Sequence, residues 1–436
     1  MPVSTTLPNG LTLLFVEKGD LPLVSLTILV RSGAAQDPDA LPGLAGFVGE
    51  MLRTGTKTRS AEQVADELET RGAVLNINVD QDSLILSATA LSENFDAVFE
   101  VVTDLVKNPA FVAAEIDRVR HRRLATLAQE RDDPGRTASR VFRRVLFESH
   151  PYGHTSLGEE AAIKKIGRAD LEAFYKKHLR PANAAIVLVG RLTPDAAKEK
   201  VTHLLGTWRG AAGVTAAPAL ALDQKPSLVL VDRPGAPQSE IRVGHLGLRR
   251  LHPDYFAVSV LNAILGGMFN SRINLNLRED KGYTYGASSS FEFWRSRGVF
   301  GVGAGVETSK TAPALTEVFK EIERIRREDV TAEELAGAKQ HFALSLPGYF
   351  ENVNAIASMA TTLCLYDLPL DYFRTLAASL DKVTIADVHR AAETYLKPEA
   401  LDVIVVGDDA VVGKSLEELG RGKLVHRDAV GAVLER

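Results

Sequence analysis

The sequence predicts an α+β chain of two homologous domains, each a mixed or antiparallel sheet with helices packed on one face. Three observations lead to this prediction. Strand-like segments precede helical segments in each half of the chain, one segment recurs near the C-terminus, and a stretch without periodicity lies between the halves. In addition, 436 residues are many for one hydrophobic core.

The recurring segment reads ADLEAFYKKHLRPANAAIVLVG from Ala169 and ADVHRAAETYLKPEALDVIVVG from Ala386, 217 residues later and without a gap. In each copy a helical pattern stops before a proline, Pro181 or Pro398, that cannot continue a helix. A short apolar, β-branched run follows and predicts a strand. The same structural unit is therefore expected twice.

The domain boundaries follow from the stretch between the copies. RGAAGVTAAPALALDQKP, residues 209–226, is rich in small residues, Gly and Pro and has no clear period, which indicates a linker. We expect an N-terminal domain over 1–208 and a homologous C-terminal domain over 227–436.

In the first half, LTLLFVEK and VSLTILVRSG alternate as strands, and a helix opens within GLAGFVGEMLRTGT. Ser60 and Gln63 form a capping box for a second helix. VLNINVD and SLILSATAL predict an antiparallel pair, followed by long helices near 93–107 and 113–130. The second half repeats this order: strands SLVLVDR and EIRVGHLG, helices from 253 to 281, strands YTYGASSSFEFW and GVFGVGAGV, then helices.

The composition is that of an ordinary globular protein, with 45% hydrophobic and 25% charged residues. A net charge of −5 gives no reason to expect nucleic acid as a partner, and no apolar run approaches the length of a membrane span. The one basic cluster contains Arg118, Arg120, His121, Arg122 and Arg123. We interpret it as a solvated helix surface, with a patch for an acidic segment as the alternative.

Few residues suggest chemistry of their own. The single cysteine, Cys364, excludes an intrachain disulfide and is expected to be a buried, inert thiol. His150 and His154 in SHPYGH have a metal-ligand spacing but no acidic residue between them, so a structural loop is expected. GVGAGV lies in an alternating strand pattern and lacks the strand-to-helix context of a phosphate loop. No self-sufficient catalytic site is predicted.

The helix in GLAGFVGEMLRTGT has two faces of different character. One face is apolar, and the opposite face carries Gly46, Gly49, Glu50 and Arg53 at the same three-and-four spacing. Each glycine costs about 1 kcal/mol relative to alanine inside a helix. The two glycines are either tolerated there or mark a site from which side chains were lost.

The segment PGLAGFVGEMLRTGTKTRSAEQVADELETRGAVLNINVDQDSLILSATAL resembles the inverted-motif zinc peptidases of the pitrilysin/insulinase type. This family includes mitochondrial processing peptidase and the core proteins of the respiratory chain. Its motif, H-x-x-E-H, places two zinc ligands and a general base on one helix face. The resemblance aligns these three residues with Gly46, Gly49 and Glu50, and the distal glutamate ligand with Thr126. It implies that this chain holds no metal or cofactor.

A second segment, LGGMFNSRINLNLREDKGYTYGASSSFE, resembles the C-terminal-domain segment of the same family. There an arginine and a tyrosine seven residues apart project to the zinc site. The corresponding residues here are Arg278, at the end of a helix, and Tyr285, at the start of a strand, with Gly282 at the turn between them. Guanidinium and phenol groups both suit a peptide carbonyl or a developing oxyanion.

The resemblance covers nearly the whole chain and implies two domains facing each other around a chamber. It suggests a non-catalytic subunit of a bacterial two-subunit processing-peptidase-like enzyme, whose homologous partner carries H-x-x-E-H and zinc. Peptides are expected to bind as an added strand along a sheet edge. The short GGMFNS loop and the lack of a visible transit peptide favour a bacterial protein, cytoplasmic or periplasmic, with no signal peptide expected. The alternatives are a scaffold like the respiratory core proteins and a peptide-binding module that does not cleave.

Overall fold

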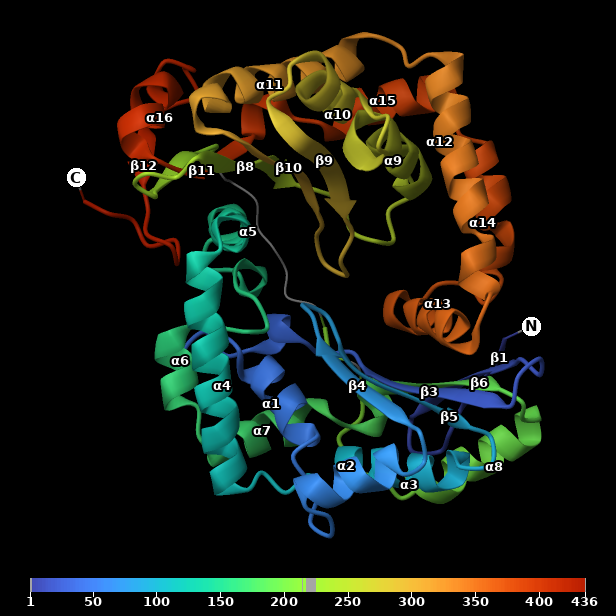
Figure 1. Ribbon diagram of the computed structural model, residues 1–436. Helices are drawn as coiled ribbons and strands as arrows, with labels where there is room; N and C mark the ends of the chain where they lie inside the picture. The colour runs from blue at the N-terminus through green and yellow to red at the C-terminus, as the bar shows by residue number, and fades with distance from the viewer. Residues whose placement is uncertain (1, 214, 217–224, 436) are drawn as a thin grey trace. The chain divides into compact units, whose positions relative to one another are not determined.

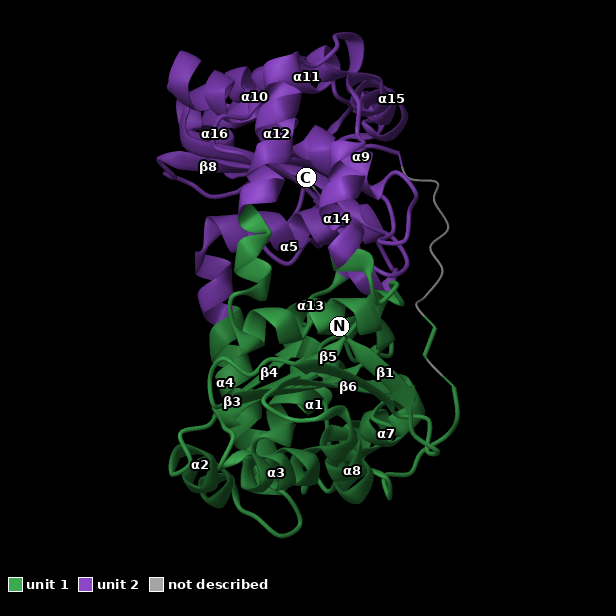
Figure 2. Ribbon diagram, turned by 90° about the vertical axis from the view of Figure 1, so that its right-hand side faces the viewer, with its two compact units in different colours: residues 1–127, 154–218, 345–373 green, residues 128–153, 219–344, 374–436 purple. Residues whose placement is uncertain are grey.

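The computed structural model describes residues 2–213, 215–216 and 225–435 (Figure 1). Within this part, the chain forms two compact units (Figure 2). Unit 1 comprises Met1–Leu127, His154–Pro218 and Ser345–Phe373, and unit 2 comprises Ala128–Gly153, Ala219–Leu344 and Arg374–Arg436. Of the predicted linker 209–226, residues 214 and 217–224 lie outside the described residues.

Unit 1 contains, in the described residues, a six-stranded sheet of order β1-β2-β6-β3-β5-β4. Its strands are β1 (Val3–Thr6), β2 (Thr12–Glu17), β3 (Leu23–Val30), β4 (Val74–Val79), β5 (Leu84–Leu91) and β6 (Ala184–Gly190). β6 runs parallel to β2 and antiparallel to β3, so the sheet is mixed. β6 is buried at every position. This burial on both faces explains why its sequence is a continuous apolar run rather than an alternating one.

The helices of unit 1 supply most of its core against one face of this sheet. They are α1 (Leu44–Leu52), α2 (Ala61–Glu69), α3 (Phe95–Lys107), most of α4 (Ala113–Asp132), α6 (Glu160–Lys165), α7 (Arg168–His178) and α8 (Pro194–Leu205). A further helix of this unit, α13 (Val353–Tyr366), packs on the other face of the sheet. Three short 3₁₀ turns, η1 (Ala34–Gln36), η3 (Pro181–Asn183) and η7 (Pro347–Phe350), complete its described part. The predicted capping box of Ser60 and Gln63 is present at the start of α2.

Unit 2 repeats the arrangement, with a sheet of order β12-β7-β11-β8-β10-β9 over its described residues. Its strands are β7 (Leu228–Asp232), β8 (Gln238–Leu246), β9 (Thr284–Glu292), β10 (Val299–Glu307), β11 (Asp402–Gly407) and β12 (Leu424–His426). β11 is parallel to β7 and antiparallel to β8, as β6 is to β2 and β3. The two copies of the repeated segment therefore end in equivalent strands.

The helices of unit 2 are α5 (Pro134–Phe147), α9 (Tyr255–Asn262), α10 (Arg272–Asn274), α11 (Thr311–Arg327), most of α12 (Ala332–Ser345), most of α14 (Tyr372–Asp381), α15 (Ile385–Tyr395) and α16 (Asp409–Glu417). Two π-helical turns, η4 (Ala263–Gly267) and η5 (Leu275–Asp280), flank α10. Short 3₁₀ turns lie at η2 (Pro151–Gly153), η6 (Thr308–Lys310) and η8 (Pro398–Ala400).

Each unit receives one helix from the other half of the chain. α13, from the second half, packs on β3 and β6 of unit 1, and α5, from the first half, packs on β8 and β11 of unit 2 (Figures 1 and 2). These strand pairs occupy the same places in the two sheets. In unit 1 the contact forms an apolar layer of its own, which contains Leu29, Val187, Ile356 and Cys364. An exchanged helix thus covers part of the second face of each sheet.

The predicted α+β class, mixed sheets and repeated strand units are confirmed. The segment Tyr255–Asp280 is long and apolar enough to cross a membrane by length and composition. However, 61% of its most apolar stretch is buried within the fold, as in the core helix of a globular domain. Cys364 is buried, and burial raises the pKa of its thiol to about 11, as expected for an inert thiol.

Candidate functional site

The N-terminus of α1 is held by a buried carboxylate. Asp37 accepts hydrogen bonds from the backbone N–H groups of Gly43 and Ala45, both at 2.7 Å. The Nε2 atom of His154 lies 3.0 Å from the same carboxylate. Burial raises the pKa of the Asp37 carboxyl, and the contact with His154 acts in the opposite direction. The contact with Asp37 gives His154 of SHPYGH a structural partner.

The glycine face of α1 is packed rather than exposed. A Cβ atom on Gly46 would lie 2.0 Å from the carbonyl oxygen of Ser156, and one on Gly49 would lie 2.6 Å from Cγ2 of Val79 in β4. Both approaches are closer than real Cβ contacts. The loop around Ser156 and the strand β4 therefore require glycine at these positions, which answers why a helix carries two of them.

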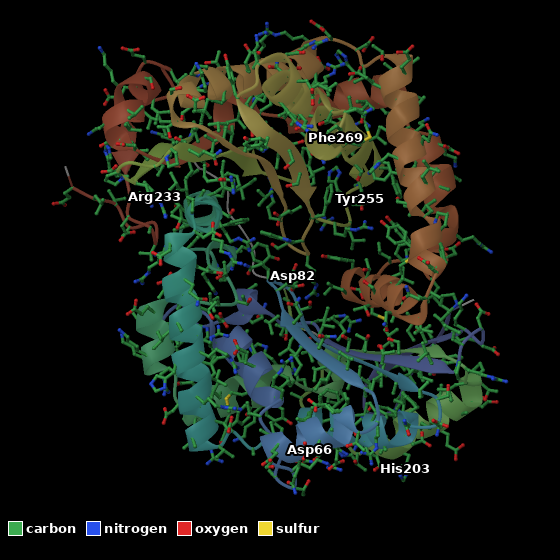
Figure 3. All side chains as sticks on the ribbon, in the orientation of Figure 1. Asp66, Asp82, His203, Arg233, Tyr255 and Phe269 are labelled. Carbon is green, nitrogen blue, oxygen red and sulfur yellow. The ribbon has the colours of Figure 1, made fainter. Side chains whose placement is uncertain are left out.

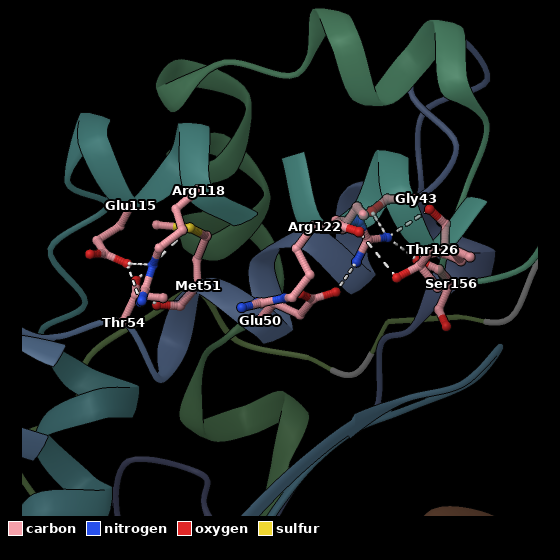
Figure 4. A network of polar contacts seen from close by, with 11 residues as sticks. Gly43, Glu50, Met51, Thr54, Glu115, Arg118, Arg122, Thr126 and Ser156 are labelled. Carbon is pink, nitrogen blue, oxygen red and sulfur yellow. Dashed lines mark hydrogen bonds and ion pairs between the residues drawn. The ribbon is translucent and has the colours of Figure 1, made fainter. Parts of the chain in front are cut away.

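Glu50, the third residue on this face, forms ion pairs with two arginines of α4 (Figure 4). Its carboxylate oxygens lie 2.6 Å from Nη2 of Arg122 and 2.6 Å from Nη1 of Arg123. The Arg123 side chain is only 3% exposed and also donates to the carbonyl oxygens of Ser156 (2.5 Å) and Leu157 (2.8 Å). Burial lowers the pKa of the Arg123 guanidinium, and Glu50 counteracts this effect. Arg123 thus ties α1, α4 and the loop of Ser156 together.

Thr126, the fourth position, hydrogen-bonds within its own helix. Its hydroxyl donates to the carbonyl of Arg122 at 3.1 Å (Figure 4). Two glycines, a carboxylate engaged by two arginines and this hydroxyl do not fit a zinc ion, which needs three or four nitrogen, sulfur or carboxylate donors. Among the residues that the structure describes, no group of three or more His, Cys, Asp or Glu is placed to hold a metal ion.

The four arginines of the basic cluster in α4 all form ion pairs with carboxylates of unit 1. Arg118 pairs with Glu115 at 2.6 Å, and Arg120 pairs with Asp117 and donates to the carbonyl oxygens of Ile163 and Ile166. Arg120, Arg122 and Arg123 thus contact neighbouring elements of unit 1, whereas Arg118 pairs within α4.

Unit 2 places the predicted arginine and tyrosine on either side of a tight turn. Arg278 lies in the π-helical turn η5, Gly282 adopts φ = +65°, and Tyr285 is the second residue of β9. Tyr285 is 91% exposed, the most exposed large hydrophobic side chain among the described residues. π-Helical turns occur frequently at functional sites. Arg278 thus lies near the end of a helical segment and Tyr285 near the start of a strand, as the sequence predicted.

Sequence reasoning missed the residue that contacts Arg278. The guanidinium carbon of Arg278 lies 4.6 Å from the ring centroid of Phe269, and Nε lies 3.4 Å from the carboxylate of Glu279. Phe269, labelled in Figure 3, is 70% exposed in the loop before α10. The signal was an aromatic residue inside the polar turn GGMFNS, where an exposed ring needs a reason.

Two asparagines anchor this region to the edge of the sheet. Oδ1 of Asn274 accepts a hydrogen bond from the backbone N–H of Ala287 in β9 (3.0 Å), while its Nδ2 donates to the carbonyl of Phe269 (2.6 Å). Nδ2 of Asn262 donates to the carbonyl of Ser289, also in β9 (3.2 Å). The side-chain amides take the place of a neighbouring strand, so they block the outer edge of β9.

Comparisons with known proteins find two family models, which match successive parts of the chain. A family model described as insulinase (peptidase family M16) matches residues 16–154, and one described as the peptidase M16 inactive domain matches residues 165–342. An uncharacterized zinc protease of Mycobacterium bovis is 26% identical over 91% of this chain and 91% of its own length. One of Bacillus subtilis is 20% identical over 80% of this chain and 85% of its own length.

Two solved structures share the fold. The peptidase M16 inactive domain from Pseudomonas fluorescens has a TM-score of 0.89 at 26% identity and covers 93% of this chain and 98% of its own. A protease from Helicobacter pylori has a TM-score of 0.87 at 19% identity, with 93% and 99% covered.

Proposed function

The chain belongs to peptidase family M16, and we propose that it is the non-catalytic subunit of a heteromeric zinc metallopeptidase that cleaves peptides. A homologous bacterial partner with an intact H-x-x-E-H motif holds the zinc ion and the general base. This chain completes the partner's active site with Arg278 and Tyr285. The observation that carries the proposal is the rebuilt face of α1, where Arg123 and the Ser156 carbonyl fill the space that zinc ligands would need.

The packing around Gly46 and Glu50 supports the loss of the zinc motif, because it leaves no space for the ligands to be restored. A histidine at position 46 would collide with the backbone of Ser156, and a residue at position 50 must compensate the buried charge of Arg123. Restoring the motif would therefore disrupt the packing of α1 against α4. Hydrolytic chemistry must then come from another chain.

Arg278 and Tyr285 supply hydrogen-bond donors suited to a peptide carbonyl. The guanidinium offers several N–H groups in a planar fork, and the phenol offers one O–H group. The ring of Phe269 restrains the guanidinium, so less side-chain entropy is lost when a carbonyl binds. Donors placed before the reaction stabilise negative charge as it develops on the carbonyl oxygen.

The sheet edges support peptide binding in unit 1 rather than on β9. No side chain in the described part of the chain hydrogen-bonds to the backbone of Val74–Val79, the edge strand β4. Its outward N–H and C=O groups can pair with an extended peptide in the manner of an added strand. Main-chain pairing of this kind gives broad specificity.

The first test uses the purified chain alone. We expect no peptidase activity and no stoichiometric zinc by elemental analysis. Activity of the chain alone that is abolished by a chelator would overturn the proposal.

The second test uses the complex reconstituted with an H-x-x-E-H partner. Arg278→Ala combined with Tyr285→Phe is expected to lower peptide turnover by about 10²–10³, the usual loss for oxyanion-type donors. The matched control is Arg249→Ala with Tyr349→Phe, two exposed residues outside this region. Equal turnover in both double variants would favour a scaffold with no part in cleavage.

A further inference from the structure

Unit 1 contains a large groove on the sheet face that carries α13. Its volume is about 920 Å³, and it lies between α13 and the outward side chains of β3, β5 and β4. The strands contribute Ser25, Ser87 and Asn76, and the helix contributes Asn354, Ser358 and Thr362. This volume lies in the range of pockets that hold ligands.

The groove is polar but almost without charge. Among its described lining residues, Asp80 is the one ionisable acid, and no lysine, arginine or histidine is present. The Asp80 carboxylate already accepts hydrogen bonds from the Ser83 hydroxyl (3.0 Å) and from the backbone N–H groups of Asp82 and Ser83. The remaining polar groups are hydroxyls and amides, and Leu23, Leu91 and Leu365 add apolar surface.

Unit 2 has the equivalent groove, which is smaller and is partly occupied by the unit's own side chains. There α5 faces β8, β10 and β9 across a volume of about 370 Å³. Arg242 extends along this groove: Nη1 lies 3.0 Å from Glu240, Nη2 donates to the carbonyl of Gly135, and Nε donates to the hydroxyl of Ser139. The side chain runs beside Gly303 of the neighbouring strand, where a Cβ atom would be in ordinary van der Waals contact with it. The two grooves therefore lie at equivalent places in the two units, and the groove of unit 1 is the larger.

We propose that the groove of unit 1 binds an extended, uncharged segment of polypeptide. The inference rests on the proposed function, in that it names the class of peptide that the subunit recruits. Hydroxyls and the amides of Asn76 and Asn354 can both donate to and accept from a peptide backbone. The groove offers an aspartate or glutamate of the ligand no cation, and it offers a lysine or arginine only Asp80, whose carboxylate already accepts three hydrogen bonds. Burying a charge without a partner is costly.

The experiment measures peptide binding to the full chain without its partner, so its outcome is independent of turnover. The probe is a fluorescein-labelled peptide of about ten residues built from Ser, Ala, Asn and Val with blocked ends, followed by fluorescence anisotropy. Ser358 is exposed on the groove side of α13, so Ser358→Arg places a charge in the groove without disturbing the core. The matched control is Ala65→Arg, on the exposed face of α2 in the same unit.

We expect saturable binding, weakened about tenfold by Ser358→Arg and changed less than about twofold by Ala65→Arg. Peptides of the same length with alternating Lys and Glu should bind at least about tenfold more weakly. Equal binding of the neutral peptide to wild type and Ser358→Arg would overturn the assignment, and so would tighter binding of the charged peptide. Competition by a neutral oligosaccharide but not by unlabelled peptide would assign the groove to sugars instead.

Discussion

The two units share a strand order and an exchanged helix, yet they leave different surfaces free. In unit 1 Arg123 joins α1 to α4 and to the loop of Ser156, while the edge of β4 and the groove beside α13 carry no such covering side chain among the described residues. In unit 2 Asn262 and Asn274 hydrogen-bond to the outer edge of β9, and Arg242 extends along the smaller groove beside α5. Unit 2 instead exposes Arg278 and Tyr285. One topology therefore carries two different surfaces, and the placement of a few side chains distinguishes them.

The largest expected effect concerns the contacts of Arg123, which join α1, α4 and the loop of Ser156 in unit 1. Arg123→Met removes the buried guanidinium of this cluster, so the carbonyls of Ser156 and Leu157 lose their donor and Glu50 keeps Arg122 alone. We expect a loss of about 3–5 kcal/mol in the free energy of unfolding of unit 1. The exposed Arg118→Met on the same helix should change it by less than about 0.5 kcal/mol.

The two tryptophans allow this loss to be assigned to one unit. Trp208 belongs to unit 1 and Trp294 to unit 2, so urea unfolding followed in Trp294→Phe and Trp208→Phe backgrounds reports on each unit separately. A shift confined to the Trp208 signal is the expected result. A shift of equal size in both signals would show that the contacts of Arg123 do not stabilise unit 1 alone.

The second effect is a pH dependence that both units should share. His178 in unit 1 and His245 in unit 2 are buried, and burial lowers the pKa of each imidazole to about 4 from 6.5. The unfolded chain therefore takes up protons first as the pH falls. The contribution of each histidine to the free energy of unfolding is therefore present above pH 6.5 and is lost as the pH falls from 6.5 to 4. The loss is about 3 kcal/mol for each histidine.

Urea unfolding at pH 7, 5.5 and 4.5 checks this expectation with the same two tryptophan reporters. His178→Gln should flatten the pH dependence of the Trp208 signal and leave that of Trp294 unchanged. An unaltered profile in unit 1 would contradict the assignment of the pH dependence to His178.

The smallest effect tests the covered edge of unit 2. Asn274→Ala leaves the buried N–H of Ala287 without an acceptor, which should cost about 1–3 kcal/mol and be visible in the Trp294 signal. It also exposes a strand edge, so concentration-dependent self-association is expected by light scattering. Asn76→Ala on β4 is the counterpart in unit 1 and should cost less than about 0.5 kcal/mol. Similar losses for the two variants would mean that the edges do not differ as described.

Much of the fold could be predicted because its signals are local. The capping box of Ser60 and Gln63 and the prolines 181 and 398 act within a few residues of themselves, and each is found where the pattern placed it. The turn at Gly282 between Arg278 and Tyr285 is local in the same sense. Phe269 was missed because its contact with Arg278 depends on how a loop folds back over a helical turn.

The sequence by itself determined the α+β plan with its repeated unit, because the hydrophobic periods and the repeat depend on residue identity and spacing along the chain, and the family resemblance added four positions to inspect, Gly46, Gly49, Glu50 and Thr126. Only the tertiary structure decided why Gly46 and Gly49 are glycines, since the atoms that exclude a Cβ come from Ser156 and Val79. It also decided which sheet each exchanged helix covers. An apolar helix such as α13 can pack on either sheet, and long-range packing selects one.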